Sequence, residues 1–457
     1  MTHKVYVVTD LGSGDGGKGS VVHAVAKSQR AHTVIKRGGA QAGHGVKTSA
    51  GKSFTLSQWG CGTLDGIPTH LSHQMIVSPE GLLNEATELR SLLGVNPFDI
   101  LTLDRRALVS TPFHGIASRL FELSLGNTPR GTVGTGVGQA YRDMMRYPEL
   151  KLAVGDLMVA DLRERLEAIR NNVVQYVMPV VEDAEFLRSD SIAVRHELSL
   201  LRDDNFIDFV HRRFREVSQL AQVVDPSYFP EVVLARRGVA VIETSHGVLT
   251  DRVYGFSPHT SAIRTLPSIT RRILDDSGYE GKIVNIGVSR AYAVRHGAGP
   301  LPTDDPKLVE RLLPGVHEQY NRWQGRVRVG ALDGVLLRYA INVCGGKNAF
   351  DGLAVTWIDQ VKKNGDWLIA NRYEGTNNPA FTPQGELRVH RHPTPEKQEE
   401  LTRALQKVAP VITRYSVDSA LTADALYAHC AEIIGNITSI PVRMISMGPT
   451  ELDKLMK

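Results

Sequence analysis

The sequence predicts an α/β fold with a mainly parallel central sheet, and three observations lead to this expectation. Apolar, strand-like runs at 4–10, 32–39, 238–247 and 283–294 each precede a glycine-rich turn. The first run leads through GSGDGGKGS, residues 12–20, in the manner of a phosphate-loop strand, loop and helix. With 457 residues and 42% hydrophobic composition, the chain can bury a large core. We therefore expect flanking helices and a functional site along the strand ends.

A charged, glycine-poor and helical-looking stretch spans residues 157–237. Within it, the pattern over 161–178 places five apolar residues on one helical face: Leu162, Leu166, Ile169, Val173 and Val177. That face predicts a packing helix. We interpret the stretch as a helical subdomain or insertion within one domain covering 1–457.

The C-terminal part of the chain has two predicted features. Residues 398–440 favour helices separated by a turn near Ser416. Residues 442–450 are typical of a late strand followed by a loop.

Composition narrows the class of protein. The net charge of +4 is spread along the chain without a lysine-rich arm, so we expect no nucleic-acid partner, whereas small anionic substrates fit. Cys61, Cys344 and Cys430 are too widely separated for a disulfide framework or a zinc motif. The sequence has no signal-peptide pattern and no long apolar run. We expect a cytoplasmic protein without a membrane partner.

The opening loop combines phosphate-binding glycines with an acidic residue. Gly14, Gly17 and Gly19 allow a tight turn, and Lys18 stands where a phosphate-loop lysine neutralises a triphosphate. Gly19 occupies the position of the usual magnesium-binding hydroxyl, while Asp15 lies inside the loop. Because phosphates repel carboxylates, Asp15 indicates a bound metal ion or a catalytic base. Glycine needed only for the turn is the simpler alternative.

Further glycine-rich segments carry polar candidates. His44 lies in GGAQAGHG, 38–45, where it is either a phosphate-contacting acid or an ordinary satisfied histidine. Thr132 lies in a second such loop, 130–143, and HGAGPLPT, 296–303, forms a third. Arg326 and Arg328, in GRVRVG, would share one side of an extended segment that either recognises an anion or is a solvated edge strand.

In order and spacing, eight segments resemble the motifs of the adenylosuccinate synthetase family. The family's G-D-E-G-K-G, N-A-G-H-T, G-T-T-G-R-G-I-G-P-A-Y and E-G-A-Q-G correspond here to GDGGKG, QAGHG, GTVGTGVGQAY and ETSHG. Its G-A-G-P-F-P-T, G-R-P-R, T-K-L-D and S-T-G-P correspond to GAGPLPT, GRVR, TWID and SMGP. The resemblance runs from residue 4 to about 450 and is weakest over 157–237. It implies a ligase that joins L-aspartate to C6 of a 6-oxopurine nucleoside monophosphate, with Mg²⁺ and GTP, or ATP or dATP, as cofactors.

The resemblance also implies catalytic roles. Asp15 is similar to the base that takes the purine N1 proton, so that O6 attacks the γ-phosphate, and also to a metal ligand. His44 resembles the acid that assists departure of the nucleoside diphosphate, Gly43 a carbonyl ligand of Mg²⁺, and Lys18 a phosphate contact.

Substrate contacts follow from the same resemblance. It implies aspartate binding by Thr303, Arg326 and Arg328. The residues with an implied role at the purine monophosphate are Ser13, Gln41, Thr132, Arg146, His246 and Thr260. Arg146 falls near a family arginine that reaches the partner subunit's site, which implies a homodimer. Asp359, Gly448 and Pro449 match the residues beside the donor base.

The departures from the family concentrate where it contacts bases. They are Ser13 for Trp, Gly16 for Glu, Gln41 for Asn, Val133 for Thr, His246 for Gln and Thr250 for Leu. The phosphate and metal residues are retained, which is expected when the reaction is kept and the purine changes. We therefore predict dGMP or GMP as the acceptor, as in a branch of the family that makes a 2-aminoadenine precursor. That branch often has serine at the position of Asp15. IMP is the alternative acceptor, and a non-catalytic nucleotide-binding switch is an alternative of another class.

Overall fold

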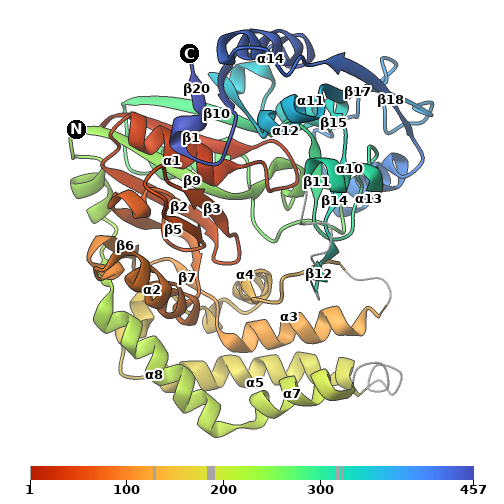
Figure 1. Ribbon diagram of the computed structural model, residues 1–457. Coiled ribbons are helices and arrows are strands. Elements are labelled where there is room, and N and C mark those ends of the chain that lie inside the picture. The colour runs from red at the N-terminus through yellow and green to blue at the C-terminus, as the bar shows by residue number, and fades with distance from the viewer. Residues whose placement is uncertain (1, 127–129, 183–190, 314–319, 322) are drawn as a thin grey trace.

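The computed structural model describes residues 2–126, 130–182, 191–313, 320–321 and 323–457. Within these ranges, an eleven-stranded sheet forms the centre of the molecule (Figure 1). In spatial order its strands are β20 (Lys454–Met456), β19 (Val442–Ser446), β16 (Gly352–Thr356), β10 (Lys282–Arg290), β1 (Thr2–Asp10), β9 (Gly238–Gly247), β2 (Thr33–Gly39), β5 (Thr69–Val77), β6 (Leu101–Asp104) and β8 (Gln222–Val224), with β7 (Leu108–Val109) paired to β5. All of its pairings are parallel except that of β19 with β20. The predicted α/β class and mainly parallel sheet are confirmed.

The helices cover the sheet and extend beyond it. They are α1 (Lys18–Ser28), α2 (Pro79–Leu93), α3 (Pro112–Ser124), α4 (Val137–Arg146), α5 (Leu162–Val181), α7 (Ser191–Arg202), α8 (Asp204–Leu220), α9 (Pro267–Asp275), α10 (Pro306–Leu312), α11 (Gly334–Val343), α12 (Ile358–Asn364), α13 (Pro395–Leu405) and α14 (Ala423–Thr438). Local signals set their ends: Ser78 caps α2 by accepting from the Gly81 amide, and Gly94 closes the helix in a left-handed conformation. In the described part of the chain, no helix combines the length and the apolar character that a membrane crossing requires.

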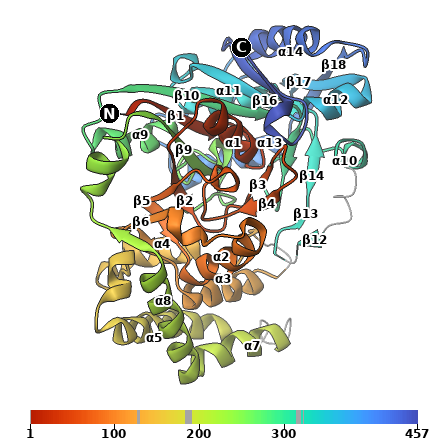
Figure 2. The ribbon, with the colours of Figure 1, turned by 60° about the vertical axis from the view of Figure 1, so that its left-hand side comes forward.

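The predicted packing helix of the central stretch is α5. All five residues assigned to its apolar face are buried. Figures 1 and 2 both show α3, α5, α7 and α8 as a layer at the end of the molecule opposite α14. Leu166 of α5 and Phe214 of α8 belong to the same hydrophobic cluster as Phe113 of α3. Residues 183–190 of the predicted 157–237 stretch lie outside the described residues, and its last part adds β8 to the sheet edge.

One predicted element is wrong. Residues 409–416, expected within helices, form β18 (Ala409–Ser416), which separates α13 from α14. β18 pairs antiparallel with β17 (Asp366–Glu374), and β17 pairs with β15 (Leu332–Asp333). The β-branched run Val411, Ile412 and Thr413 fits a strand, and the long partner strand supplies the hydrogen bonds. The late strand β19 and the loop after it are confirmed.

Small two-stranded ribbons carry several of the glycine-rich loops. They are β3 (His44–Lys47) with β4 (Ser53–Leu56), β11 (Ala293–Arg295) with β14 (Arg328–Gly330), and β12 (Tyr320–Asn321) with β13 (Gly325–Arg326). All three are antiparallel.

Candidate active site

A large cavity of about 1640 Å³ lies at the carboxyl ends of the sheet strands. Its walls include the loops that follow six neighbouring strands, β2, β9, β1, β10, β16 and β19. Open parallel sheets place ligand sites at these strand ends. The cavity therefore lies along the strand ends, where the sequence predicts the functional site.

Most of the predicted site residues line this cavity. They are Ser13, Gly14, Asp15, Gly17, Lys18, Gly19, Gln41, Gly43, His44, Thr132, Arg146, His246, Thr260, Asp359, Gly448 and Pro449. Among the described residues, the three expected to bind aspartate, Thr303, Arg326 and Arg328, are outside the lining. Segments from residue 13 to residue 449 thus meet around one space.

The opening loop presents Asp15 to the cavity. Asp15 has a φ of 56°, a left-handed conformation that aspartate tolerates better than most residues, and half of its side chain is exposed. Lys18 begins α1 and is buried, with its Nζ 3.0 Å from the carboxylate of Asp10. A Cβ on Gly19 would lie 2.9 Å from the Cβ of His44. The missing side chain at position 19 therefore lets His44 approach the start of α1.

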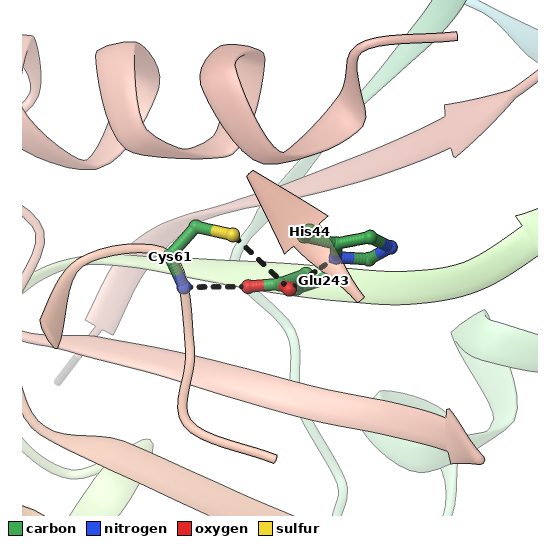
Figure 3. A group of neighbouring side chains, drawn as sticks. All are labelled: His44, Cys61 and Glu243. Atoms are coloured by element: carbon green, nitrogen blue, oxygen red, sulfur yellow. Dashed lines mark hydrogen bonds and ion pairs between the residues drawn. The ribbon is translucent and has the colours of Figure 1, made fainter. Parts of the chain in front are cut away.

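The buried carboxylate of Glu243 fixes the ring of His44 through Nδ1. Its Nδ1 lies 2.5 Å from Oε1 of Glu243, a residue of β9 (Figure 3). Glu243 also accepts from the backbone N–H of Cys61 at 2.8 Å and forms an ion pair with Lys36 at 3.0 Å. The Cys61 thiol completes the group at 3.3 Å from the same carboxylate. With Nδ1 engaged, the other ring nitrogen is the one available to a ligand.

Burial and charge fix the ionisation of this group. Burial lowers the pKa of His44, so the imidazole is neutral at neutral pH. The pKa of Glu243 is lowered despite its burial, because Lys36 and His44 stabilise the carboxylate. Burial raises the pKa of the Cys61 thiol well above its usual value. A neutral thiol and a carboxylate already paired with an ammonium are poor metal ligands, so we interpret the group as a support for His44.

Two of the substituted purine positions contact each other. Nε2 of Gln41 lies 2.9 Å from Nε2 of His246, a residue with a φ of 63°. Desolvation lowers the pKa of His246 to about 4, so its ring is neutral at neutral pH. Within the described residues, Oε1 of Gln41 has no hydrogen-bond partner. The Thr250 hydroxyl donates to the Gly247 carbonyl at 2.9 Å, inside its own turn.

Several polar residues of the cavity were missed by sequence reasoning. Arg295 is buried and donates to Ser13 Oγ at 3.1 Å and to the carbonyls of Ala298 and His259. His296 places Nε2 3.2 Å from Oδ2 of Asp15. Both residues stand directly before the predicted GAGPLPT segment in the sequence. Their position next to a predicted site motif is the signal that could have identified them.

The predicted aspartate residues hold the neighbouring loop. Arg328 donates to the carbonyls of Gly297 and Gly299 at 2.9 and 2.7 Å. The Thr303 hydroxyl is buried and donates to the Ala331 carbonyl at 2.8 Å. Arg326 is exposed and lies on β13, so Val327 separates it from the strand of Arg328. The two arginines therefore lie on successive short strands that pair with different partners, β12 and β11.

The predicted donor-base residues form another wall. Asp359 accepts from Nε2 of Gln360 at 2.7 Å, and Lys454 donates to the Gly448 carbonyl at 2.6 Å. Trp357, with a φ of 62°, lies against the Arg290 guanidinium at 4.0 Å from the ring centroid. Arg290 also donates to the Asp15 carbonyl at 3.0 Å, which links this wall to the opening loop.

Comparison with known proteins agrees with these features. The family model described as adenylosuccinate synthetase matches residues 7–454. The adenylosuccinate synthetase of Legionella pneumophila, strain Philadelphia 1, is 26% identical over 98% of this chain and 96% of its own length.

Two solved structures share the fold. The fully ligated adenylosuccinate synthetase from Plasmodium falciparum has a TM-score of 0.73 and 20% identity, with 99% of each chain covered. The succinoaminodeoxyadenylate synthetase of cyanophage S-2L, solved with dGMP and with dATP as an energy donor, has a TM-score of 0.58 and 14% identity over 100% of this chain and 96% of that chain. The family model's match over nearly the whole length shows that the chain belongs to the adenylosuccinate synthetase family, ligases that form a C–N bond between aspartate and a purine nucleotide and use Mg²⁺ and GTP.

Proposed function

We propose that this ligase acts on a guanine nucleoside monophosphate, dGMP or GMP, and forms the 2-amino-N6-succinyladenine nucleotide. The observation that carries the proposal is the Gln41–His246 pair on the cavity wall, with its carbonyl oxygen free of any described partner. Oε1 of Gln41 is buried against its own chain, so we propose that the amide turns toward the cavity and that this oxygen then accepts from the 2-amino group of guanine. Hypoxanthine lacks that group and would leave the acceptor unpaired, at about 1–3 kcal/mol.

In the first step Asp15 takes the N1 proton of the purine, and O6 attacks the γ-phosphorus of the triphosphate. His44 assists departure of the nucleoside diphosphate, and Lys18 together with the amides near Gly14, Gly17 and Gly19 binds the phosphates. The fixed ring of His44 supports this role, because Glu243 engages Nδ1 and leaves Nε2 for the leaving oxygen. Since burial keeps the ring neutral, Nε2 must take up a proton before it can donate, and the negative charge of a bound triphosphate favours that step.

Oxygen donors suit Mg²⁺, and the cavity offers them. The half-exposed carboxylate of Asp15 and the carbonyl of the exposed Gly43 both belong to the lining. These two residues would hold the ion, which neutralises phosphate charge when bound. The carboxylate inside an anion-binding loop is thereby explained.

In the second step the aspartate amine attacks C6, and inorganic phosphate leaves. We assign the aspartate to the loop that Arg328 braces, with Thr303 and Arg326 closing on it when substrate is present. Thr132 and Thr260 would bind the 5′-phosphate, joined by Arg146 from a second subunit of a homodimer.

The same proposal treats 1–457 as one domain, with 157–237 as its helical part.

For the donor we favour GTP. Asp359 would pair with N1 and the 2-amino group of guanine, beside Gly448 and Pro449. Adenine offers no N1 donor to a carboxylate. Trp357, one face of which is taken by Arg290, either belongs to the wall or stacks on the donor base.

One experiment tests acceptor and donor together. The protein is incubated with L-aspartate and Mg²⁺ against IMP, GMP and dGMP separately, each with GTP, ATP or dATP, and the succinyl product is followed by mass. We expect a guanine monophosphate to be converted at least about tenfold more efficiently than IMP, and GTP to be the best donor. Asp15→Asn is the inactive control, because it keeps the shape of the loop and removes the base.

Two results would contradict the proposal. Conversion of IMP alone would make the chain an adenylosuccinate synthetase in the strict sense and would overturn the acceptor assignment. Equal or better turnover with ATP or dATP would overturn the donor assignment. The switch hypothesis predicts no aspartate-dependent phosphate release, and membership of a ligase family speaks against it.

A further inference from the structure

The carboxylate of Asp10 lies beneath the opening loop and contacts it at three points. Asp10 ends β1 and is almost completely buried. Its Oδ1 accepts from the Gly12 amide at 2.7 Å, and its Oδ2 accepts from the Gly16 amide at 2.9 Å. Oδ2 also forms the ion pair with Lys18 at 3.0 Å. The Asp10 side chain therefore binds both ends of the turn that carries Asp15, at Gly12 and Gly16. It also connects that turn to Lys18.

The same carboxylate fills the space in front of Gly16. A Cβ at position 16 would lie 2.7 Å from Oδ2 and 2.9 Å from Cγ of Asp10, so a side chain there is excluded while Asp10 is present. The backbone of Gly16 is not in the left-handed region, so lack of space, rather than strain, requires glycine. Position 16 is where the family motif has glutamate. Besides Asp15, the loop thus has one acidic group close to it, which comes from position 10, while position 16 is glycine.

We propose that Asp10 is a positioning residue of the catalytic loop, whose carboxylate replaces a side chain at position 16, holds the turn of Asp15 and fixes the Lys18 ammonium at the cavity wall. The inference rests on the proposed role of Lys18 in triphosphate binding. Both partners of the ion pair are out of contact with water, since their side chains are 3% and 0% exposed. Loss of the carboxylate would leave a buried, unpaired ammonium and two amides without an acceptor.

The test removes the carboxylate at position 10 and introduces one at position 16 by substitution. Asp10→Ala is expected to lower kcat by about 10- to 100-fold, the cost of a misplaced catalytic group, and to raise KM for GTP because Lys18 loses the carboxylate that fixes it. Gly16→Glu alone is expected to inactivate the enzyme, because its Cβ overlaps Asp10. The double variant Asp10→Ala with Gly16→Glu should recover about tenfold or more over the matched control, Asp10→Ala with Gly16→Ala. Hydrogen exchange of the 11–20 amides should follow the same order, with protection lost in Asp10→Ala and regained only with the glutamate.

The outcomes separate this inference from the proposed function. If the two double variants have equal kcat and equal amide protection, the role of Asp10 is refuted. If Lys18→Met keeps the GTP affinity of the unchanged protein, the proposed role of Lys18 fails, and the inference fails with it. If no purine monophosphate is converted at all, the proposed function fails, while restored amide protection in the glutamate variant still supports the positioning role.

Discussion

Glu243 is the residue on which His44, the proposed catalytic histidine, depends for its orientation. Its carboxylate serves four different groups at once: the His44 imidazole, the Lys36 ammonium, and the amide and the thiol of Cys61. A buried carboxylate is stable only when it is paired and hydrogen-bonded in this way. Glu243 therefore contributes both to the stability of the core and to the orientation of His44.

Glu243→Gln should separate these two contributions. Loss of the charge leaves Lys36 unpaired in the core, so we expect the free energy of unfolding to fall by about 3–5 kcal/mol. We also expect kcat to fall, because an amide can present a donor to Nδ1 and allow the wrong ring orientation. Urea titration and steady-state kinetics measure the two effects.

A second buried glutamate provides the matched control. Glu85 accepts from the backbone amides of Ser57, Gln58 and Trp59, at 2.9, 2.8 and 3.2 Å. Glu85→Gln should lower stability while kcat of the folded enzyme is unchanged. If both variants lose kcat to the same extent, the orientation of His44 by Glu243 is not supported.

At the scale of elements, helix α1 and the β3–β4 ribbon approach each other at a glycine. A Cβ at position 19 would also lie 2.9 Å from the carbonyl oxygen of Gly45, a distance that side chains do not tolerate. The absent hydroxyl at this phosphate-loop position is therefore explained by packing against β3. The close approach brings the start of the helix and His44 to the same wall.

Gly19→Ala should displace the ribbon. Alanine favours the helix by about 1 kcal/mol, so we expect the melting temperature to change little, whereas kcat falls by more than about tenfold because His44 moves. Gly435→Ala in α14 is the control, since its Cβ meets no atom within 4 Å. A fully active Gly19→Ala enzyme would show that the contact does not position His44.

Sequence patterns predicted elements well where they rest on local properties. The strands β1, β2, β9 and β10 appear as apolar runs before glycines, and the five-residue face of α5 follows helical spacing. β18 was missed because its partner strand, distant in sequence, decides its conformation. The glycine-rich loops are also recognisable from local sequence, and they line the cavity.

The supporting charges of the site could not be predicted. Lys36, Glu243 and Asp10 lie in strands, where a charged residue in an apolar run resembles a solvated edge position. Only the tertiary partners make their burial possible. His296 was quoted within a loop, yet its contact with Asp15 requires two segments about 280 residues apart to meet.

At the scale of the whole molecule, buried histidines couple folding to pH. Burial lowers the pKa of His70 to about 4 and that of His114 to about 3. In the unfolded chain both titrate near 6.5, so below that pH the unfolded state binds more protons. The stability that these groups contribute is present above pH 6.5 and is lost as pH falls toward 4.

We therefore expect the free energy of unfolding to fall between pH 6.5 and 4, by about 2 kcal/mol for each histidine at pH 5. His70→Phe keeps the stacking on Phe229, where the ring centroids are 5.3 Å apart, and should reduce this slope. Urea midpoints at pH 7, 6 and 5 measure it, with the exposed His392→Gln as the control. Parallel curves for His70→Phe and the unchanged protein would contradict the assignment.

The central position of β1 has a consequence for how the chain is made. β1 is synthesised before the other described strands of the sheet, yet both of its neighbours, β9 and β10, begin more than 230 residues later. Until they are synthesised, an apolar strand has two unpaired edges, which favours association with other nascent chains and slows folding. The cavity is complete only when residue 449 has emerged, so activity cannot begin before that point, and early binding by a chaperone would protect the strand that leads into the opening loop.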